Sequence, residues 1–297
     1  MDLEYLNWLK NNMLIQKIQW WLWNQMFQYA FIKALSLRNK VDFKLDISEY
    51  KTYFRPYELE VFNIEKKYAK LAEIPFYERY NFDNKYLSYI SNILIKPIFS
   101  RLNKNHKIDN NLKYDETFLH QDSWYFDGFF QCEKYFKDFS SEIRKDFTFR
   151  KELSSRNIKF LESIKWKNSV CVHVRRWDYL NLKDVCNICW LDYYNKAMKL
   201  ISEKIKDPVF LFFSDDSKRV KENFKWNNYM FIDWNKWKDS WQDMALMSKC
   251  KHNIIANSSF SWWGGWLNDN IGKIVIVPKK PWNGFNKNYY PTWWVKL

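Results

Sequence analysis

The sequence predicts an α/β protein with open parallel sheets, and two features of the chain carry this prediction. The second half alternates short apolar runs with helical patterns, as a parallel sheet with crossover helices requires. The first half opens with an apolar run that turns directly into a pattern of helical periodicity. A polar stretch at 149–168 separates the two patterns. We therefore expect two Rossmann-like domains, one over 13–150 and one over 151–297.

The first domain begins with a predicted strand at Leu14, Ile15 and Ile18, because these residues form a short apolar run. A helix is predicted to begin near Asn24, where apolar residues start to recur at helical spacing. These residues are Phe27, Ala30, Phe31, Ala34 and Leu35. The region around 104–111 is polar and predicts a loop.

Five apolar runs predict the strands of the second domain, and helical patterns fall between them. The expected strands are 169–175, 209–213, 230–233, 253–256 and 273–277. One helix is indicated by Tyr194, Ala197, Met198, Ile201 and Ile205, and another by Met244, Leu246 and Met247.

The chain carries a formal charge of +14, with its Lys and Arg residues scattered along the whole length. Such an excess favours an anionic partner: a nucleotide diphosphate, an anionic lipid headgroup or a nucleic acid. A nucleic-acid-binding protein should show a recognisable binding module or a basic helix with interleaved aromatic residues. The sequence contains neither, so we expect no nucleic-acid partner.

The sequence has no apolar run of about 18 residues, and its charged N-terminus lacks the apolar stretch of a signal peptide. We therefore expect a cytoplasmic protein. Five cysteines are an odd number without the spacing of a disulfide framework, which favours reduced thiols. Cys186 and Cys189 form a lone pair without a histidine partner, so no zinc site is expected.

Three tryptophans, Trp20, Trp21 and Trp23, stand in the predicted turn between the first strand and the first helix. A turn of this kind beside a ligand usually contains glycine, because only a missing side chain lets the backbone approach so closely. Ordinary composition would supply about 21 glycines in a chain of this length. The sequence has 5 Gly and 18 Trp.

We therefore hypothesise that the gene comes from a lineage that reads the UGA codon as glycine, and that the sequence as written translates this codon as tryptophan. The alternative is a diverged, aromatic-rich chain with a damaged site. With glycine at the three positions, segment 20–31 resembles the opening motif of the bacterial alpha-1,2-fucosyltransferases, glycosyltransferase family eleven.

Three further segments carry this resemblance. Segment 172–179 reads Val-His-Val-Arg-Arg-Trp-Asp-Tyr and resembles the family's His-Val-Arg-Arg-Gly-Asp-Tyr, with Trp177 in the glycine position. Segments 212–216 and 247–264 match without alteration, and there Trp262 and Trp263 match family tryptophans. Trp237 is a further candidate for a recoded glycine. The resemblance extends from about Met13, the expected start of the protein, to the C-terminus.

The resemblance implies a GT-B fold, in which two Rossmann-like domains face each other, and an inverting galactoside alpha-1,2-fucosyltransferase. GDP-beta-L-fucose would give its fucosyl group to the 2-hydroxyl of a terminal galactose in a bacterial surface glycan. Because such glycans are commonly built on lipid carriers, peripheral contact with an anionic inner membrane stays open. The alternatives are a related transferase that uses another nucleotide sugar and a non-catalytic glycan- or nucleotide-binding remnant.

Arg175 and Arg176 follow the strand at 169–175, on the edge of a parallel sheet where ligands usually bind. Guanidinium groups bind phosphate through a planar, charged fork, so both should stabilise the departing diphosphate. No metal ion is then needed. His173 points to the same side of the strand as Arg175. The resemblance favours a nucleotide contact for it, and a core histidine is the alternative.

Asn257, Ser258 and Ser259 follow a predicted strand and precede a helix, whose free amides would bind the diphosphate. Asp215 and Asp216 follow the strand at 209–213. They lack the Asp-x-Asp spacing of metal-dependent sugar transferases, so we expect them to position the arginines or the nucleotide.

Asn24 and the neighbouring Gln25 open the first helix and are expected near the reacting sugar, Asn24 as a catalytic residue. Inversion requires a base that takes the proton of the acceptor hydroxyl. Asp178 is a weak candidate for this base, because the adjacent arginines could already occupy it. Asp243 is expected to be a surface charge on the helix that leads to Met247.

Overall fold

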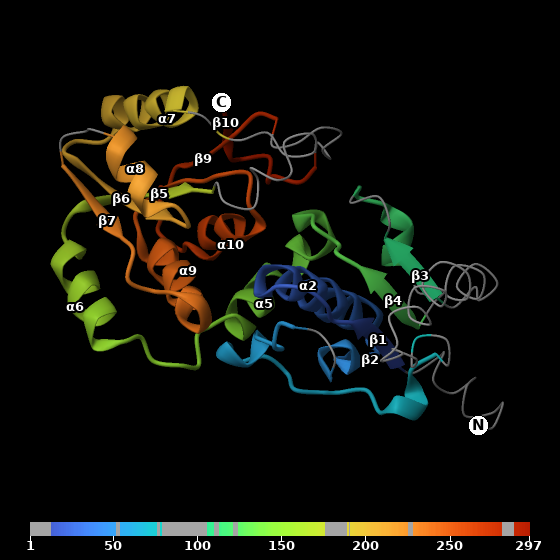
Figure 1. The fold of residues 1–297 in the computed structure, drawn as a ribbon. Coiled ribbons are helices and arrows are strands. Elements are labelled where there is room, and N and C mark those ends of the chain that lie inside the picture. The colour runs from blue at the N-terminus through green and yellow to red at the C-terminus, as the bar shows by residue number, and fades with distance from the viewer. Residues whose placement is uncertain are drawn as a thin grey trace. The chain divides into compact units, whose positions relative to one another are not determined.

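The computed structural model describes residues 13–51, 54–75, 78, 106–109, 113–120, 124–175, 189, 191–224, 228–280 and 288–297. The chain divides into two compact units. Unit 1 is Met1–Arg150 with Asn286–Tyr289, and unit 2 is Lys151–Phe285 with Tyr290–Leu297. Each unit contains helices and one parallel sheet (Figure 1), so the predicted α/β class is confirmed. The return of 286–289 to unit 1 is not part of the predicted division into two consecutive domains.

The sheet of unit 1 has the strand order β2-β1-β4-β3, and all neighbouring strands are parallel. The strands are β1 (Met13–Lys17), β2 (Asp42–Asp46), β3 (His106–Asp109) and β4 (Tyr125–Gly128). Strand β1 confirms the predicted first strand. Strand β3 shows that the loop expected at 104–111 was wrong. Because β3 is an edge strand that pairs with β4 through its backbone, it does not need an apolar sequence.

Helix α2 (Leu22–Asn39) confirms the predicted first helix and supplies much of the core of unit 1. Its residues from Asn24 to Leu35 are all buried, and the ring of Phe31 stacks on that of Phe130 with centroids 3.8 Å apart. The remaining elements of unit 1 are short. They are α5 (Ser140–Asp146) and the 3-10 helices η1 (Ser48–Lys51), η2 (Leu59–Val61), η3 (Leu71–Glu73), η6 (Glu116–Leu119), η7 (Glu133–Tyr135) and η8 (Lys137–Phe139).

The sheet of unit 2 has the order β10-β9-β8-β5-β6-β7, again with parallel neighbours throughout. Five strands confirm the five predicted ones, and the two-residue β10 was not predicted. The strands are β5 (Asn168–Val174), β6 (Pro208–Ser214), β7 (Tyr229–Ile232), β8 (His252–Ile254), β9 (Val275–Val277) and β10 (Val295–Lys296). Counted from β7, this is the strand order of the classic dinucleotide-binding fold.

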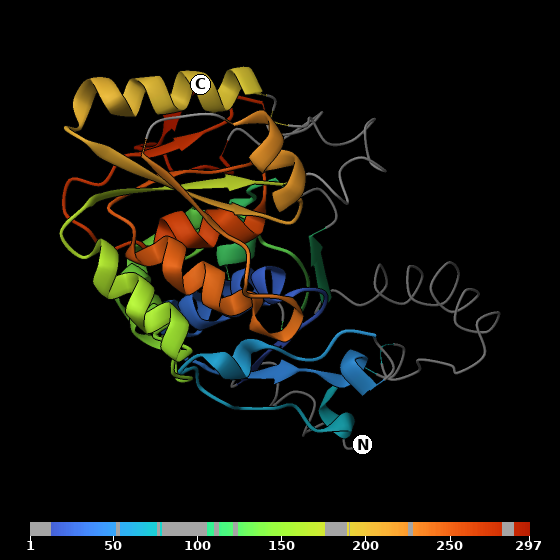
Figure 2. The same ribbon diagram turned by 60° about the vertical axis from the view of Figure 1, so that its left-hand side comes forward.

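Helices cover both faces of the sheet of unit 2 (Figures 1 and 2), with α7 over one face and α9 and α10 under the other. The helices are α6 (Ser155–Ile164), α7 (Leu191–Lys204), α8 (Ser217–Asn223), α9 (Ser240–Lys249) and α10 (Ser259–Leu267), and η10 (Trp237–Asp239) is a 3-10 turn. Val170, Val172 and Val174 pack in one core cluster with residues of α7 and α8. Among the described helices, none is long and apolar enough to cross a membrane.

Candidate functional site

The carboxyl edge of the sheet in unit 2 brings together several residues that were predicted to bind the donor. Strand β5 is followed in the sheet by β6 and β7 on one side, while β8, β9 and β10 extend it on the other. The strand order therefore reverses between β5 and β8. Ligands of open parallel sheets bind outside the carboxyl ends of the strands at such a point. Arg175 follows β5, and Asn257 and Ser258 follow β8, so these residues border it.

Arg175 is held by an acid from the neighbouring strand. Its Nε lies 3.3 Å from Oδ2 of Asp215, which directly follows β6. Asp216 has a different described contact: it caps α8, and its Oδ1 accepts a hydrogen bond from the backbone N of Arg219 at 3.3 Å. Arg176 and Asp178 lie outside the described residues, and their roles stay predictions.

His173 is a buried, neutral histidine at this edge. Burial, and then the neighbouring charge of Arg175, lower its pKa to about 3. Its ring lies against Phe260 of α10 with centroids 5.6 Å apart, and in the described part of the chain its Nδ1 has no hydrogen-bond partner. Buried polar atoms are normally satisfied by protein or by something bound. This open nitrogen therefore favours the ligand contact over a satisfied core histidine.

The depressed pKa of His173 gives a pH prediction. Below pH 6.5, His173 binds a proton in the unfolded chain but stays neutral in the folded chain. The free energy of unfolding therefore decreases as the pH falls towards 3. We expect the unaltered chain to lose about 2 kcal/mol more than a His173→Gln variant between pH 6.5 and 5, at about 1.4 kcal/mol per unit. Urea unfolding at the two pH values measures this difference. Parallel losses in both proteins would contradict it.

The N-terminus of α10 follows β8 along the chain. Ser258 is the N-cap residue, and its side chain makes no capping hydrogen bond. The hydroxyl therefore does not satisfy the free amides of the first turn, which begins at Ser259. Asn257 is buried, and its Oδ1 accepts a hydrogen bond from Cys189 Sγ at 3.7 Å. Diphosphate binding at these residues remains a prediction, and their geometry is compatible with it.

Asp243 was expected to be a surface charge, and this expectation was wrong. It lies in the first turn of α9, which follows β7, and its Oδ1 accepts a hydrogen bond from Asn235 Nδ2 at 2.7 Å. Burial raises the pKa of Asp243 to about 7, Asn235 lowers it in part, and nearby Asp233 raises it. Asp233, and not Asp243, directly follows β7, so the sequence carried no strand-end signal for this buried acid.

In unit 1, one of the three tryptophans after β1 has a backbone that favours glycine, whereas Trp21 has φ −75° and Trp23 lies within α2. Trp20 has φ +72°, which is a left-handed conformation that a bulky residue rarely adopts. Its carbonyl accepts hydrogen bonds from Gln25 Nε2 and from the hydroxyl of Tyr50, both at 2.8 Å, and these bonds fix the turn. Trp237 also has a left-handed φ, +54°, and its side chain is 78% exposed. Trp177 lies outside the described residues.

Trp262 and Trp263 of α10 differ from Trp20 and Trp237 in both burial and backbone conformation. Trp262 and Trp263 are fully buried, and their rings meet edge to face with centroids 4.9 Å apart. They are core residues with ordinary packing, as genuine family tryptophans should be. The contrast with the exposed, left-handed Trp20 and Trp237 supports the recoding hypothesis.

Asn24 and Gln25 are both buried at the start of α2. Asn24 Oδ1 accepts a hydrogen bond from Gln131 Nε2 at 2.8 Å. Gln25 uses both ends of its amide inside unit 1, because its Nε2 holds the carbonyl of Trp20 and its Oε1 accepts from the backbone N of Glu58 at 2.9 Å. Gln25 thus shapes the turn, and the catalytic role of Asn24 stays a prediction.

Transfer without a metal ion stays a prediction. Because Arg175 already supplies positive charge, we expect transfer to retain its rate in excess chelator. Loss of activity on chelation, restored by manganese or magnesium, would contradict this prediction.

The sequence matches the model of glycosyl transferase family 11 over residues 4–297. It is 31% identical over 307 residues to an alpha-1,2-colitosyltransferase of Escherichia coli, covering 96% of this chain and 99% of the relative. It is 30% identical to the O-antigen biosynthesis glycosyltransferase WbnK of Escherichia coli, covering 90% and 94%. A galactoside alpha-(1,2)-fucosyltransferase 1 of Saimiri boliviensis boliviensis is 27% identical and covers 46% and 41%.

Two solved structures are similar in fold. NodZ alpha-1,6-fucosyltransferase, co-crystallized with GDP, has a TM-score of 0.50 at 14% identity and covers 85% of this chain and 91% of its own. A mutant of Arabidopsis thaliana FUT1 in complex with GDP has a TM-score of 0.50 at 10% identity, with coverages of 97% and 79%. The fold is therefore of the GT-B type, as predicted. Because the family model matches nearly the whole chain, this chain belongs to glycosyl transferase family 11 and is a glycosyltransferase.

Proposed function

We propose that this glycosyltransferase moves L-fucose from GDP-β-L-fucose to the 2-hydroxyl of a terminal galactose, with inversion at the transferred carbon. One observation carries the proposal: His173 and Arg175 at the end of β5, and the N-terminus of α10 after β8, border the point where the strand order of unit 2 reverses. Among the described residues, His173 Nδ1 has no hydrogen-bond partner and Ser258 makes no capping bond. A nucleoside diphosphate needs a cation, hydrogen-bond partners and free amides, and this edge offers all three. Relatives named for alpha-1,2 transfer support the linkage.

In this proposal the reaction is a direct attack of the acceptor hydroxyl on the fucosyl carbon. Arg175 and Arg176 stabilise the charge that builds on the departing GDP, and Asp215 holds the guanidinium of Arg175 in place. The amides at Ser258 and Ser259 would bind the same diphosphate. Asn24 in unit 1 would lie near the reacting sugar, and Asp178 remains the weak candidate for the base. When the leaving group is well stabilised, the demand on a base is smaller.

A second donor is favoured by one specific finding, the similarity to an alpha-1,2-colitosyltransferase. Colitose is fucose without its 3-hydroxyl, so the two donors differ by one oxygen atom. A site that hydrogen-bonds this hydroxyl would reject the deoxy sugar strongly, whereas an apolar site would accept both. The donor is therefore the part of the proposal that needs a direct test.

The test is a donor panel with a β-galactoside acceptor: GDP-fucose, the GDP-linked colitose and GDP-mannose. We expect GDP-fucose to give the highest kcat/KM and an alpha-1,2-linked product, identified by nuclear magnetic resonance of the purified oligosaccharide. Preference for colitose would replace the donor in this proposal. Failure to use any donor, in a chain with its motif glycines restored, would favour the non-catalytic remnant.

A further inference from the structure

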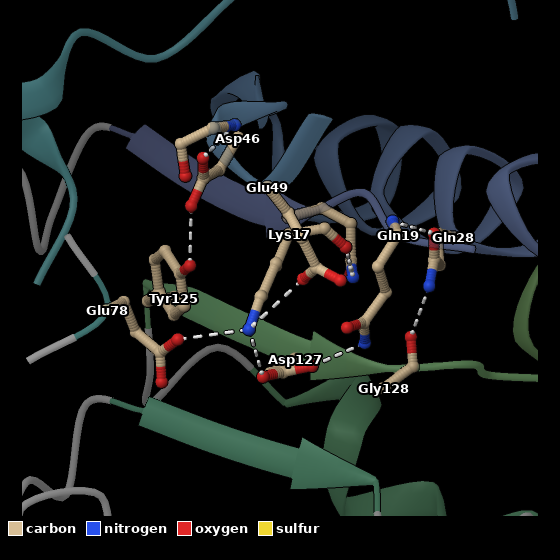
Figure 3. Close-up of polar contacts among 11 residues, drawn as sticks. Lys17, Gln19, Gln28, Asp46, Glu49, Glu78, Tyr125, Asp127 and Gly128 are labelled. Carbon is tan, nitrogen blue, oxygen red and sulfur yellow. Dashed lines mark hydrogen bonds and ion pairs between the residues drawn. The ribbon is translucent and has the colours of Figure 1, made fainter. Parts of the chain in front are cut away.

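The carboxyl end of β1 in unit 1 holds a lysine among three carboxylates (Figure 3). Lys17 Nζ lies 3.0 Å from Glu78 Oε2, 3.2 Å from Asp127 Oδ2 and 3.7 Å from Glu49 Oε2. Burial alone lowers the pKa of Lys17, but the attraction of Asp127, Glu78 and Glu49 outweighs burial and raises the pKa well above its ordinary value. Lys17 is therefore a permanent cation, and its three partners leave an excess of negative charge.

Asp127 joins this cluster to the turn after β1. Its Oδ2 contacts Lys17, and its Oδ1 accepts a hydrogen bond from Gln19 Nε2 at 2.7 Å (Figure 3). Gln28 of α2 fixes both strand ends, because its Oε1 accepts from the backbone N of Gln19 at 3.0 Å and its Nε2 donates to the carbonyl of Gly128 at 3.1 Å. The Asp127 and Gln19 side chains are thus held in place by their neighbours.

The carboxylates of Glu78 and Asp127 differ in their exposure to solvent. The side chain of Glu78 is 3% exposed and that of Asp127 is 17% exposed, although both contact the same ammonium group. Glu78 therefore serves as an internal counter-ion. Asp127 is the more exposed of these two carboxylates, and Gln19 beside it is also only partly buried.

The place of this pair in the sheet points to a ligand. Strand order in unit 1 reverses between β1 and β4, because β2 lies on one side of β1 while β4 and β3 lie on the other. Gln19 follows β1, and Asp127 is the third residue of β4. The adjoining Trp20 has the left-handed backbone of a glycine turn, where a ligand can approach the main chain closely. This is the ligand edge of unit 1 by the rule that applies to unit 2.

We propose that Asp127 and Gln19 bind the acceptor sugar through two adjacent hydroxyl groups, and that Lys17 is a positioning residue that holds Asp127. This inference rests on the proposed transfer to a galactose hydroxyl. A carboxylate accepts hydrogen bonds, and a glutamine amide both donates and accepts, so the pair matches a vicinal diol. Asp127 thereby selects a hydroxyl next to the one that reacts, which makes it a specificity-determining residue.

The test is an Asp127→Asn variant assayed with methyl β-galactoside and with its 3-deoxy and 4-deoxy analogues. We expect kcat/KM for the parent acceptor to fall about 10- to 100-fold, as for a lost hydrogen bond to a charged group. The KM for the donor and its hydrolysis by water should stay within about twofold. With the analogue that lacks the contacted hydroxyl, variant and unaltered enzyme should become equal, because the shared interaction is already absent.

Each variant is made in the full chain, both as written and with glycine at 20, 21, 23 and 177, so that low activity of one background does not hide the effect. Asp138→Asn is the matched control, since Asp138 of unit 1 also forms an ion pair, at 2.8 Å from Arg38. It should leave acceptor kinetics unchanged. Lys17→Met should raise the acceptor KM and leave the donor KM unchanged. Lys17→Arg should raise the acceptor KM less than Lys17→Met does. If Lys17→Met does not fold, the Asp127 series decides.

The inference is overturned if the Asp127→Asn substitution lowers kcat/KM by the same factor with all three acceptors. It is also overturned if the substitution raises the donor KM as much as the acceptor KM. Failure of the proposed function looks different: the unaltered chain would then not consume GDP-fucose in either background. In that case the same acceptors are titrated directly by saturation-transfer nuclear magnetic resonance. Equal binding to the Asp127→Asn variant and the unaltered protein would then reject the assigned contact, and weaker binding by the variant would support it.

Discussion

Arg175→Ala is expected to slow fucosyl transfer more than about 100-fold, which corresponds to at least about 3 kcal/mol of lost transition-state stabilisation. The guanidinium of Arg175 follows β5 at the reversal point of the sheet and is held by Asp215. Charge builds on the leaving diphosphate between the bound substrate and the transition state, so the loss should appear in kcat as well as in kcat/KM. Steady-state and single-turnover rates with GDP-fucose measure both.

A conservative variant separates charge from geometry at this position, and a control variant lies in unit 1. Arg175→Lys keeps the positive charge but loses the planar fork, so it should recover only part of the rate. Arg38→Ala removes an arginine of unit 1 that is also paired with an aspartate, and it should leave turnover unchanged. An Arg175→Ala enzyme with near-full turnover would show that the family role of this arginine does not transfer to this chain.

The fold was predictable where burial dictates the sequence. In a parallel sheet covered on both faces, strands become continuous apolar runs, and β5 and β6 are read directly from such runs. Strands β3 and β10 lie at sheet edges, where backbone pairing suffices and the sequence carries little signal. Helix α6 falls inside the polar stretch that was read as a domain boundary, because only Asn157, Phe160 and Ile164 of its residues are buried.

In the candidate site, only the residues that follow a predicted strand could be identified from the sequence. Arg175, Asp215 and Asn257 each follow a strand, and the parallel sheet places strand ends together. The cluster around Lys17 could not be foreseen in this way. Its members Glu78 and Asp127 lie 61 and 110 residues away from Lys17 in the chain, and only tertiary packing brings them to one ammonium group.

Glycine at positions 20, 21, 23 and 177 together is expected to strengthen donor binding and transfer more than about tenfold relative to the sequence as written. Forcing extra volume against a bound ligand costs about 1–3 kcal/mol, and an indole is the largest side chain that could stand there. Trp20 adds a second cost, because its left-handed backbone is free of strain only for glycine. GDP binding by calorimetry and transfer from GDP-fucose measure the gain.

Glycine at Trp262 or Trp263 is the matched control, and there the same substitution should do harm. Both side chains are fully buried in α10, and removing a buried aromatic ring costs about 3–5 kcal/mol of unfolding free energy. Urea unfolding of the two single variants measures this loss. The recoding hypothesis thus predicts opposite signs for one substitution at two sets of positions, which a merely aromatic-rich protein does not. UGG codons at 20, 21, 23 and 177, or equal transfer by the written and the restored chains, would refute it, and these tryptophans would then be genuine parts of the site.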